Sequence, residues 1–288
     1  MKKLILSSLA LALIIGFVSC AKKSPNISGK NTLGTSSTTT APPVVGLPVG
    51  DVPKDFTKKA LLEEFTGEWC GWCPEGAKIM DDLEAAHPQT FVGVAVHDGD
   101  PMELPAFNTY IKGLTSVSGF PNGSVQRADA QGRGSWTGDI NAALGQTATC
   151  GLSMVTKLKG STLDADIYIG YNAALPAGSK LTVYVTEDDV PQSSPGAQSN
   201  YSSSVVVDAN WTHAHVLRGV LTSNPGDDFT QNVAKKYTKV SFTGIDLSGM
   251  KINDLNKLNV VAFVNLATAP RDVLNIQSCV AGTTKKWD

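Results

Sequence analysis

The sequence lacks a strong charge of either sign. Lys and Arg number 24 and Asp and Glu number 26, so the net charge at pH 7 is −2, and charged residues make up 17% of the chain. Proteins that bind nucleic acid or anionic lipid present a stripe of basic side chains to the phosphates. No basic stripe is visible in this sequence, and we therefore expect no nucleic-acid partner.

Long apolar runs are scarce as well. One run, from Leu4 to Val18, follows Lys2 and Lys3. It is shorter than the roughly 20 residues that a membrane-spanning helix needs. A basic start followed by a short apolar run is typical of a secretory signal peptide. The sequence therefore predicts a signal peptide over residues 1–19.

The end of this signal resembles a bacterial lipoprotein cleavage site, Phe17–Cys20. Cleavage would leave Cys20 as a lipidated amino terminus; the alternative is an ordinary signal peptide with a chance cysteine. No aspartate and no acidic cluster follows Cys20, which favours the periplasmic face of the outer membrane over the cell surface. Residues 20–55 are rich in Ser, Thr, Pro, Gly and Lys and poor in large apolar groups, so we predict a flexible tether.

Only five cysteines are present, and two of them, Cys70 and Cys73, lie within Trp69–Pro74. The run Ala60–Phe65 before them is typical of a buried strand, and Phe91–Val96 is typical of a second one. A Cys-x-x-Cys at the junction of a strand and a helix is typical of a thioredoxin-like redox motif. Between the two strands, apolar residues recur at helical spacing: Ala77, Met80, Leu83 and Ala86.

The run Glu64–Cys73 is similar to the active-site strand and loop of the thioredoxin family. That family has a buried acid six residues before the first cysteine, a position that Glu64 holds here, and a cis-proline that faces the cysteines. Gly119-Phe120-Pro121 looks like the cis-proline site, so the resemblance implies a cis bond before Pro121. The sequence departs from the family in the Gly71-Trp72 pair and in the bulky Phe120.

The motif and the resemblance give each residue an expected role. Cys70 would lie exposed at the helix start, where the helix dipole favours a thiolate, and would be the nucleophile; Cys73 would be the resolving thiol. Pro121 would shape the groove for the substrate backbone. Glu64 could accept the proton of Cys73, or it could be a strand-edge carboxylate, because only one of Glu63 and Glu64 can point inward.

The sequence gives little support to metal or cofactor chemistry. A zinc site at the two motif cysteines needs two more ligands, and no second Cys-x-x-Cys or histidine pair lies nearby. His213 and His215 fall on one face of a predicted strand, but two ligands do not make a site, so packing is the preferred interpretation. We interpret His97 as a solvated histidine at a strand end. We expect no metal and no cofactor.

The second half of the chain changes to period-2 alternation with turn residues between the apolar runs, after a predicted helix from Trp136 to about Gly145. This pattern is typical of an antiparallel, immunoglobulin-like β-sandwich. The sequence therefore predicts an α/β thioredoxin-like domain over residues 56–148 and an all-β sandwich over residues 149–288. The predicted strands are Leu152–Leu158, Leu163–Tyr168, Lys180–Thr186, His213–Leu221, Thr238–Thr243, Leu258–Leu266 and Val273–Cys279.

A thioredoxin fold followed by a sandwich, on a lipoprotein, resembles the twenty-eight-kilodalton outer membrane protein family of Gram-negative bacteria. The run His213–Arg218 carries this resemblance at the level of residues. Members are known by location more than by activity. The resemblance therefore implies an architecture and an outer-membrane location, but no mechanism.

Two cysteines remain once Cys20 and the motif pair are set aside. Cys150 opens the first predicted strand of the sandwich, and Cys279 closes the last. If those strands pair antiparallel, the two sulfurs can meet, and an oxidising envelope favours a structural disulfide between them. The alternative is two buried free thiols.

The sequence is compatible with two classes of function. The first is an envelope thiol–disulfide oxidoreductase whose partners are protein thiols or disulfides, tethered to the outer membrane by a lipid anchor. The second is an outer-membrane binding or adhesion module in which the thioredoxin-like domain is mainly a scaffold, since a fold does not fix a function. The direction of any redox chemistry depends on a potential that the sequence does not specify.

Overall fold

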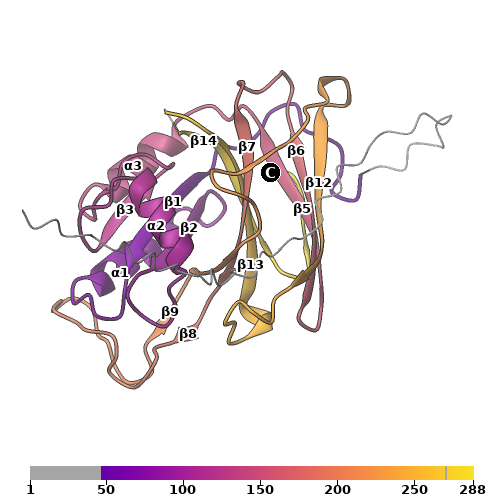
Figure 1. Cartoon of the computed structure of the whole chain (residues 1–288). Coiled ribbons are helices and arrows are strands. Elements are labelled where there is room, and N and C mark those ends of the chain that lie inside the picture. Colours follow the sequence, from indigo (N-terminus) through magenta and orange to yellow (C-terminus); the bar gives the residue numbers. More distant parts are fainter. Residues whose placement is uncertain (1–46, 270) are drawn as a thin grey trace, which may run out of the picture.

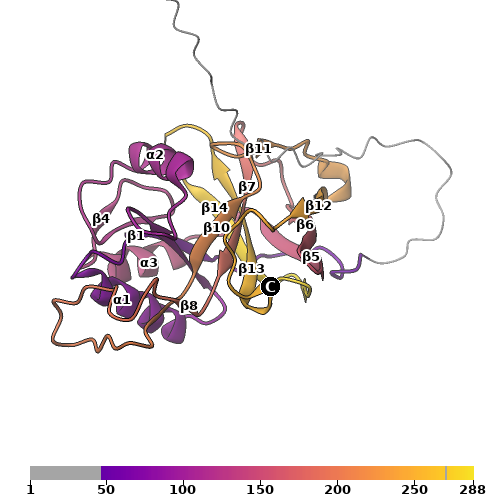
Figure 2. The same cartoon turned by 60° about the horizontal axis from the view of Figure 1, so that its bottom comes forward.

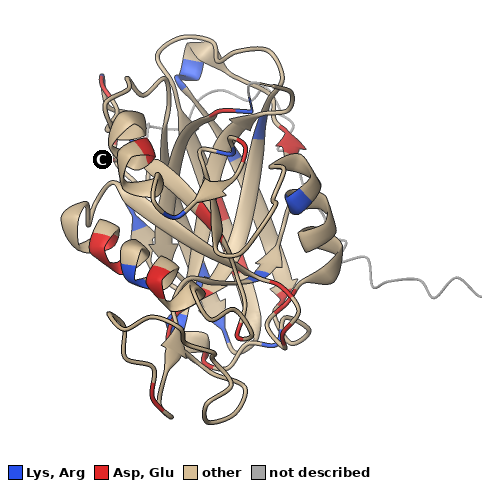
Figure 3. Cartoon of the chain, turned by 90° about the vertical axis from the view of Figure 1, so that its left-hand side faces the viewer, with Lys and Arg blue, Asp and Glu red and all other residues tan. Residues whose placement is uncertain are grey.

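The computed structural model describes residues 47–269 and 271–288. The predicted signal peptide, Cys20 and the tether up to residue 46 lie outside the described residues. No helix in the described part of the chain is long and apolar enough to cross a membrane. This part is rich in β-structure, with few helices (Figure 1). Acidic and basic residues are interspersed on the side drawn in Figure 3, as the balanced composition predicts.

One large sheet contains strands from both halves of the chain. Its nine strands lie in the order β14-β13-β7-β10-β2-β1-β3-β4, with β11 paired to β7. The two halves meet where β10 runs parallel to β2, at Val216 and Ala95. The sheet thus crosses the domain boundary predicted after residue 148, and that boundary stays a prediction. The strands are β1 Ala60–Thr66, β2 Phe91–His97, β3 Asn122–Val125, β4 Gln131–Gly132, β7 Ser179–Glu187, β10 Val216–Val220, β11 Asp227–Asp228, β13 Leu258–Leu266 and β14 Val273–Val280.

Three helices cover the part of this sheet that contains β1 and β2 (Figure 1). Alternate side chains of β1 face opposite layers. Leu61 and Phe65 pack in one cluster with Phe107 of α2, whereas Leu62 packs with Met80 of α1 in another cluster that includes α3. Helices α1 and α3 therefore cover one face of the sheet and α2 covers the other. The helices are α1 Cys73–Ala86, α2 Pro105–Leu114 and α3 Trp136–Leu144.

A second sheet, in the order β12-β6-β5-β15, packs against the β7 and β13 region of the large sheet (Figure 1). Met154 and Ile167 of the second sheet share one core cluster with Val183 and Val260 of the first, and all four side chains are fully buried. Burial of this kind stabilises by roughly 1.5–3 kcal/mol per side chain. The remaining elements are β5 Gly151–Lys159, β6 Thr162–Gly170, β8 Val190–Pro191, β9 Thr212–His213, β12 Tyr237–Asp246, β15 Thr284–Lys285 and the short helices η1 Val233–Lys235 and η2 Leu255–Lys257.

The strands predicted in the second half are present, with one difference. The predicted strand His213–Leu221 is divided into β9 and β10. His215 lies between them with φ of 57°, in the left-handed region that interrupts an extended strand. His213 and His215 therefore do not share a strand face, which corrects the expectation from their spacing.

The predicted disulfide between Cys150 and Cys279 is wrong, because both residues are buried free cysteines. The side chains of Asn275 and Gln277 donate to the carbonyl oxygens of Cys150 and Leu152, at 2.7 and 3.2 Å. β14 and β5 therefore run in the same direction where they meet, not in opposite directions as expected. Cys279 lies four positions beyond Asn275, and four residues of strand span roughly 13 Å. This separation is beyond disulfide reach.

The last part of the predicted tether, residues 47–55, contacts the second half of the chain. Val49 is buried. Trp287 Nε1 donates to the Gly50 carbonyl oxygen at 2.9 Å, and the Trp287 ring also packs on Phe56. The burial of Val49 and the hydrogen bond to Gly50 therefore place this segment on the folded body.

Candidate functional site

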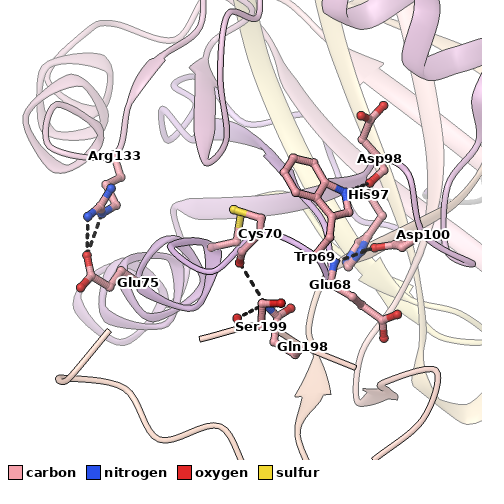
Figure 4. The surroundings of a disulfide bond; sticks show 11 residues. Glu68, Trp69, Cys70, Glu75, His97, Asp98, Asp100, Arg133, Gln198 and Ser199 are labelled. Carbon is pink, nitrogen blue, oxygen red and sulfur yellow. Dashed lines mark hydrogen bonds and ion pairs between the residues drawn. A yellow bond between two sulfur atoms is a disulfide. The ribbon is translucent and has the colours of Figure 1, made fainter. Parts of the chain in front are cut away.

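Cys70 and Cys73 form a disulfide where β1 passes into α1, with their Cα atoms 5.4 Å apart (Figure 4). Helix α1 begins at Cys73, and Pro74 lies in its first turn. A backbone N–H in the first turn has no acceptor within the helix, so the N–H that proline lacks costs no hydrogen bond there. Cys70 is 4% exposed and Cys73 is 2% exposed. The expectation that Cys70 is exposed is therefore wrong for this oxidised state, because another segment covers the motif.

The covering segment is residues 192–202, which we call the strap; it follows β8 and precedes β9 in the second half of the chain. The strap donates hydrogen bonds to three backbone carbonyls of the motif loop. This arrangement ties the motif loop to the second half of the chain. The bonds run from Ser199 N to Glu68 O at 2.7 Å, from Gln198 Nε2 to Cys70 O at 3.1 Å and from Tyr201 N to Gly71 O at 2.7 Å.

Side chains strengthen the contact between strap and motif. Ser193 donates its backbone N–H and its hydroxyl to the Glu68 carboxylate, at 2.6 and 2.5 Å. The Tyr201 ring lies so close to Gly71 that any Cβ at position 71 would collide with it. The same ring meets Trp72 edge-on, with centroids 6.0 Å apart. The close approach of Tyr201 thus explains why the motif has glycine at position 71.

Aromatic side chains flank the disulfide. Trp69 and Trp72 are 50% and 44% exposed. Trp69 packs on Phe120, with ring centroids 5.2 Å apart, and donates Nε1 to the Asp98 carbonyl oxygen at 2.7 Å (Figure 4). The bond between Phe120 and Pro121 is cis, as predicted. The predicted proline loop and the cysteine loop therefore meet through Trp69 and Phe120.

Arg133 also contacts Trp72. Its guanidinium lies 5.4 Å from the centre of the Trp72 ring, within the range of a cation–π contact. Arg133 also pairs with Glu75 in the first turn of α1, with Nη2 2.6 Å from the carboxylate (Figure 4). Trp72 is thus half exposed yet held by Tyr201 and Arg133.

Glu64 is buried beneath the start of α1. Its Oε1 atom has no hydrogen-bond partner among the described residues and occupies the space where a side chain at Gly76 would begin. Gly76 and Cys73 are three positions apart on α1 and share a helix face, so the carboxyl lies under the same face as Cys73. Burial, and then the charge of Asp81, raise the pKa of Glu64 to about 8. Glu64 is therefore protonated at neutral pH.

Glu63 is buried too, on the opposite face of β1, so the expectation that only one of Glu63 and Glu64 points inward is wrong. The Tyr184 hydroxyl donates to Glu63 Oε1 at 2.8 Å, and Arg127 Nε lies 3.5 Å from Glu63 Oε2. The Arg127 guanidinium also stacks 4.7 Å from the centre of the Phe263 ring. These four side chains come from both halves of the chain and link them.

The histidines differ from the sequence-based expectations. His97 is buried, not solvated, because Asp100 holds its Nδ1 at 2.7 Å. The His213 ring meets His97 edge-on at 4.8 Å, and burial, followed by the charge of His97, lowers the pKa of His213 to about 3. His215 pairs instead with Asp188, at 3.3 Å. Among the residues that the structure describes, no group of His, Cys, Asp and Glu is arranged to hold a metal ion.

A pocket of about 430 Å³ opens beside Glu64, between α1 and residues 206–215. Asp81 and His215 line it together with Glu64. The pocket is polar and has room for several water molecules. It therefore gives the otherwise enclosed Glu64 carboxyl a route to solvent.

Sequence reasoning did not identify the strap as part of this site. The strap consists mostly of Ser and Gln, with single Pro, Gly and Asn residues, and has no apolar periodicity, which is typical of a loop and indicates nothing about its contacts. A long loop in a compact domain is often functional. The length of the segment between β8 and β9 was thus the one available signal.

The sequence pattern of a known family matches residues 108–285, and that family is described as outer membrane protein Omp28. The chain belongs to the Omp28 family. This confirms the resemblance to the twenty-eight-kilodalton outer membrane proteins. The matched residues begin in α2 and end in β15. Membership therefore rests on the second half together with the last part of the first half, which contains Pro121, and does not include Cys70 or Cys73.

Solved structures are similar to most of the chain. HBP35 of Porphyromonas gingivalis has a TM-score of 0.66 at 20% identity, covering 80% of this chain and 77% of that one. A protein from Agrobacterium tumefaciens has a TM-score of 0.51 at 15% identity, covering 81% of this chain and 98% of that one. A comparison with curated proteins gave no match. At these identities the likeness concerns the fold alone.

Proposed function

We propose that this protein is a thiol–disulfide oxidoreductase of the cell envelope, with Cys70 and Cys73 as its redox pair. In this proposal the first half is a thioredoxin-like domain, and the second half is an immunoglobulin-like sandwich that shares its sheet. The observation that carries the proposal is the disulfide at the start of α1 with the buried, unpartnered Glu64 carboxyl beneath the same helix face. A purely structural disulfide needs no such carboxyl, whose burial without a partner costs free energy.

The proposed reaction consists of two thiol–disulfide exchanges. A thiolate of the partner protein attacks Cys70 Sγ, the bond to Cys73 breaks, and the departing Cys73 sulfur takes the proton of Glu64. The partner's second thiolate then attacks the partner sulfur of the mixed disulfide, which forms the partner's disulfide and releases Cys70 as a thiolate. Two electrons pass from the partner to the pair, and the reverse sequence reduces a partner disulfide.

The neighbouring residues support this assignment of roles. Cys70 precedes the amino end of α1, where the helix dipole stabilises a thiolate. Trp69 and Trp72 offer exposed apolar surface on either side of Cys70. Phe120 contacts Trp69, and we assign the groove beside Pro121 to the backbone of the partner.

The proposed location is the periplasmic face of the outer membrane. Membership in a family of outer membrane proteins supports a location at the outer membrane. The run Phe17–Cys20 supports a lipid anchor at Cys20. A tether from Cys20 would let the folded body reach partner proteins in the periplasm.

The reduction potential of the Cys70–Cys73 pair tests the proposed function. Protein that starts at residue 21 is equilibrated in glutathione buffers, and the fraction of reduced pair is measured by alkylation and mass spectrometry. We expect reversible reduction of the folded protein at about −120 to −270 mV, the range of known thiol–disulfide oxidoreductases. A pair that is reduced only when the protein unfolds would contradict the proposal.

One observation favours the alternative, a binding module in which the first half is a scaffold. The strap covers the motif and leaves Cys70 only 4% exposed. If the cover never opens, the disulfide is a fixed link between loop and helix. The same measurement separates the two functions, because a fixed link would not exchange with glutathione in the folded protein.

A further inference from the structure

A second pocket, of about 460 Å³, lies where the strap begins. Its walls come from three parts of the chain that are distant in sequence: Met102 after β2, residues 190–193 of β8 and the strap, and the Lys251 to Asn253 loop before β13. Arg218 of β10 also lines it. Figure 2 labels β8 and β10, the two strands that border the pocket. The proposed redox chemistry uses none of these side chains.

Arg218 brings unused hydrogen-bond donors to this pocket. The residue is only 3% exposed, and its Nε donates to Glu187 at 2.7 Å. Its two terminal nitrogens make no hydrogen bond or ion pair with any residue that the structure describes. A guanidinium has five N–H donors in a fixed fork, so four of them remain free. The terminal nitrogens are not among the buried atoms that lack a partner, so solvent reaches them in the pocket, where a bound acceptor would take the place of water.

The charge around the pocket fits a ligand with one negative charge. Glu187 neutralises Arg218 and accepts further hydrogen bonds from the backbone of Asn253 and Asp254. Lys251 is the other charged residue that lines the pocket, and within the described part of the chain its Nζ donates to the Pro101 carbonyl oxygen, at 3.1 Å. A planar carboxylate matches the guanidinium fork and carries a single charge, whereas phosphate carries more than one at neutral pH.

One wall of the pocket is apolar. Met102 and Val190 are both buried and form a small cluster with Val216. A ligand that places only a carboxylate near Arg218 would leave this wall in contact with water. Burying a short hydrocarbon chain against it stabilises by roughly 0.8 kcal/mol per methylene group.

We propose that this pocket binds a small organic carboxylate. The terminal nitrogens of Arg218 and the Lys251 ammonium hold the carboxylate, and the hydrocarbon part packs on Met102 and Val190. The site is separate from the disulfide and goes beyond the proposed redox function. It borders the redox loop through Ser193, which lines the pocket and also binds the Glu68 carboxylate.

Titration with hexanoate, followed by NMR of methionine methyl groups, tests this site in the folded oxidised protein. We expect the Met102 methyl signal to shift with a saturable dependence on hexanoate, while the Met154 signal from the sandwich core stays in place. The uncharged analogue 1-hexanol should shift Met102 much less. Lys251→Gln should weaken hexanoate binding roughly tenfold, the effect of losing one charged hydrogen bond.

Lys257→Gln is the matched control. Lys257 is a nearby lysine that pairs with Asp189 and does not line the pocket, so hexanoate affinity should be unchanged. Arg218 is left in place, because its removal would leave Glu187 buried without its cation. A Met102 signal that does not move with hexanoate, that moves equally with hexanol, or that responds more tightly to inorganic phosphate would overturn the proposal. None of these outcomes depends on whether the disulfide exchanges with partners.

Discussion

The ring of Tyr201 lies against Gly71, and the Tyr201 N–H donates to the Gly71 carbonyl oxygen at 2.7 Å. This contact joins the strap, from the second half of the chain, to the loop between the two motif cysteines. The proposed redox site is therefore built from both halves. Access to Cys70 depends on how firmly the strap is held.

Gly71→Ala should loosen the strap. The new Cβ would collide with the Tyr201 ring and displace it, and overpacking of this kind costs about 1–3 kcal/mol. We expect a lower free energy of unfolding in urea and faster reduction of the disulfide by dithiothreitol. The control is Gly113→Ala in α2, where a Cβ meets nothing within 4 Å and should stabilise the helix by about 0.5–1 kcal/mol. Equal reduction rates in wild type and Gly71→Ala would show that the strap does not limit access.

Glu64 should make the oxidised protein less stable as the pH rises. The pKa of Glu64 is raised from 4.5 to about 8 by burial and by Asp81. Between these two values the native state holds a proton that the unfolded state has lost. The free energy of unfolding therefore falls with rising pH, by up to about 1.4 kcal/mol per unit.

Glu64→Gln tests this dependence, because the amide has no proton to lose. Urea unfolding at pH 5 and pH 8 should show a wild type that loses stability relative to Glu64→Gln over this interval. Asp82→Asn, on the exposed side of α1, is the control and should follow the wild type. A wild type and a Glu64→Gln variant with parallel pH dependence would mean that Glu64 is ionised in the folded protein.

The local chemistry of the site could be predicted from sequence, but its long-range contacts could not. The spacing of Cys70 and Cys73, the position of Glu64 and the cis bond before Pro121 follow from a motif and a resemblance, and the strands follow from period-2 patterns. The parallel pairing of β10 with β2 depends on contacts between residues far apart in the chain, which local periodicity does not encode. The expectation of a solvated His97 is wrong in part for the same reason, because its ring packs on His213 from the second half, while Asp100, three positions along the chain, holds its Nδ1.

Arg127→Leu should destabilise the protein strongly. Arg127 is the buried cation beside Glu63, so its removal leaves the Glu63 carboxylate buried without a charge partner. Breaking a buried pair in this way costs about 3–5 kcal/mol. The double variant Glu63→Leu with Arg127→Leu should recover part of the loss. Urea unfolding of both variants measures the difference, and a double variant less stable than Arg127→Leu alone would refute this account of the cluster.

Cys150 and Cys279 should remain free thiols. Burial raises the pKa of the Cys150 thiol to about 12, so it is protonated and unreactive in the folded protein. Iodoacetamide should label neither cysteine in the native oxidised protein that starts at residue 21, and both after unfolding without reductant. Recovery of a Cys150–Cys279 peptide from protein purified from the envelope would contradict the structure.

The central claim, that Cys70 and Cys73 exchange disulfides with other proteins, is tested most directly by trapping partners in cells. Cys73→Ala leaves Cys70 without its resolving thiol, whereas Cys70→Ala leaves only Cys73, within α1 and beneath the motif loop. Non-reducing gels of envelope extracts should show covalent adducts with Cys73→Ala and few or none with Cys70→Ala. Absence of adducts from both variants, when both are folded and correctly localised, would contradict the claim.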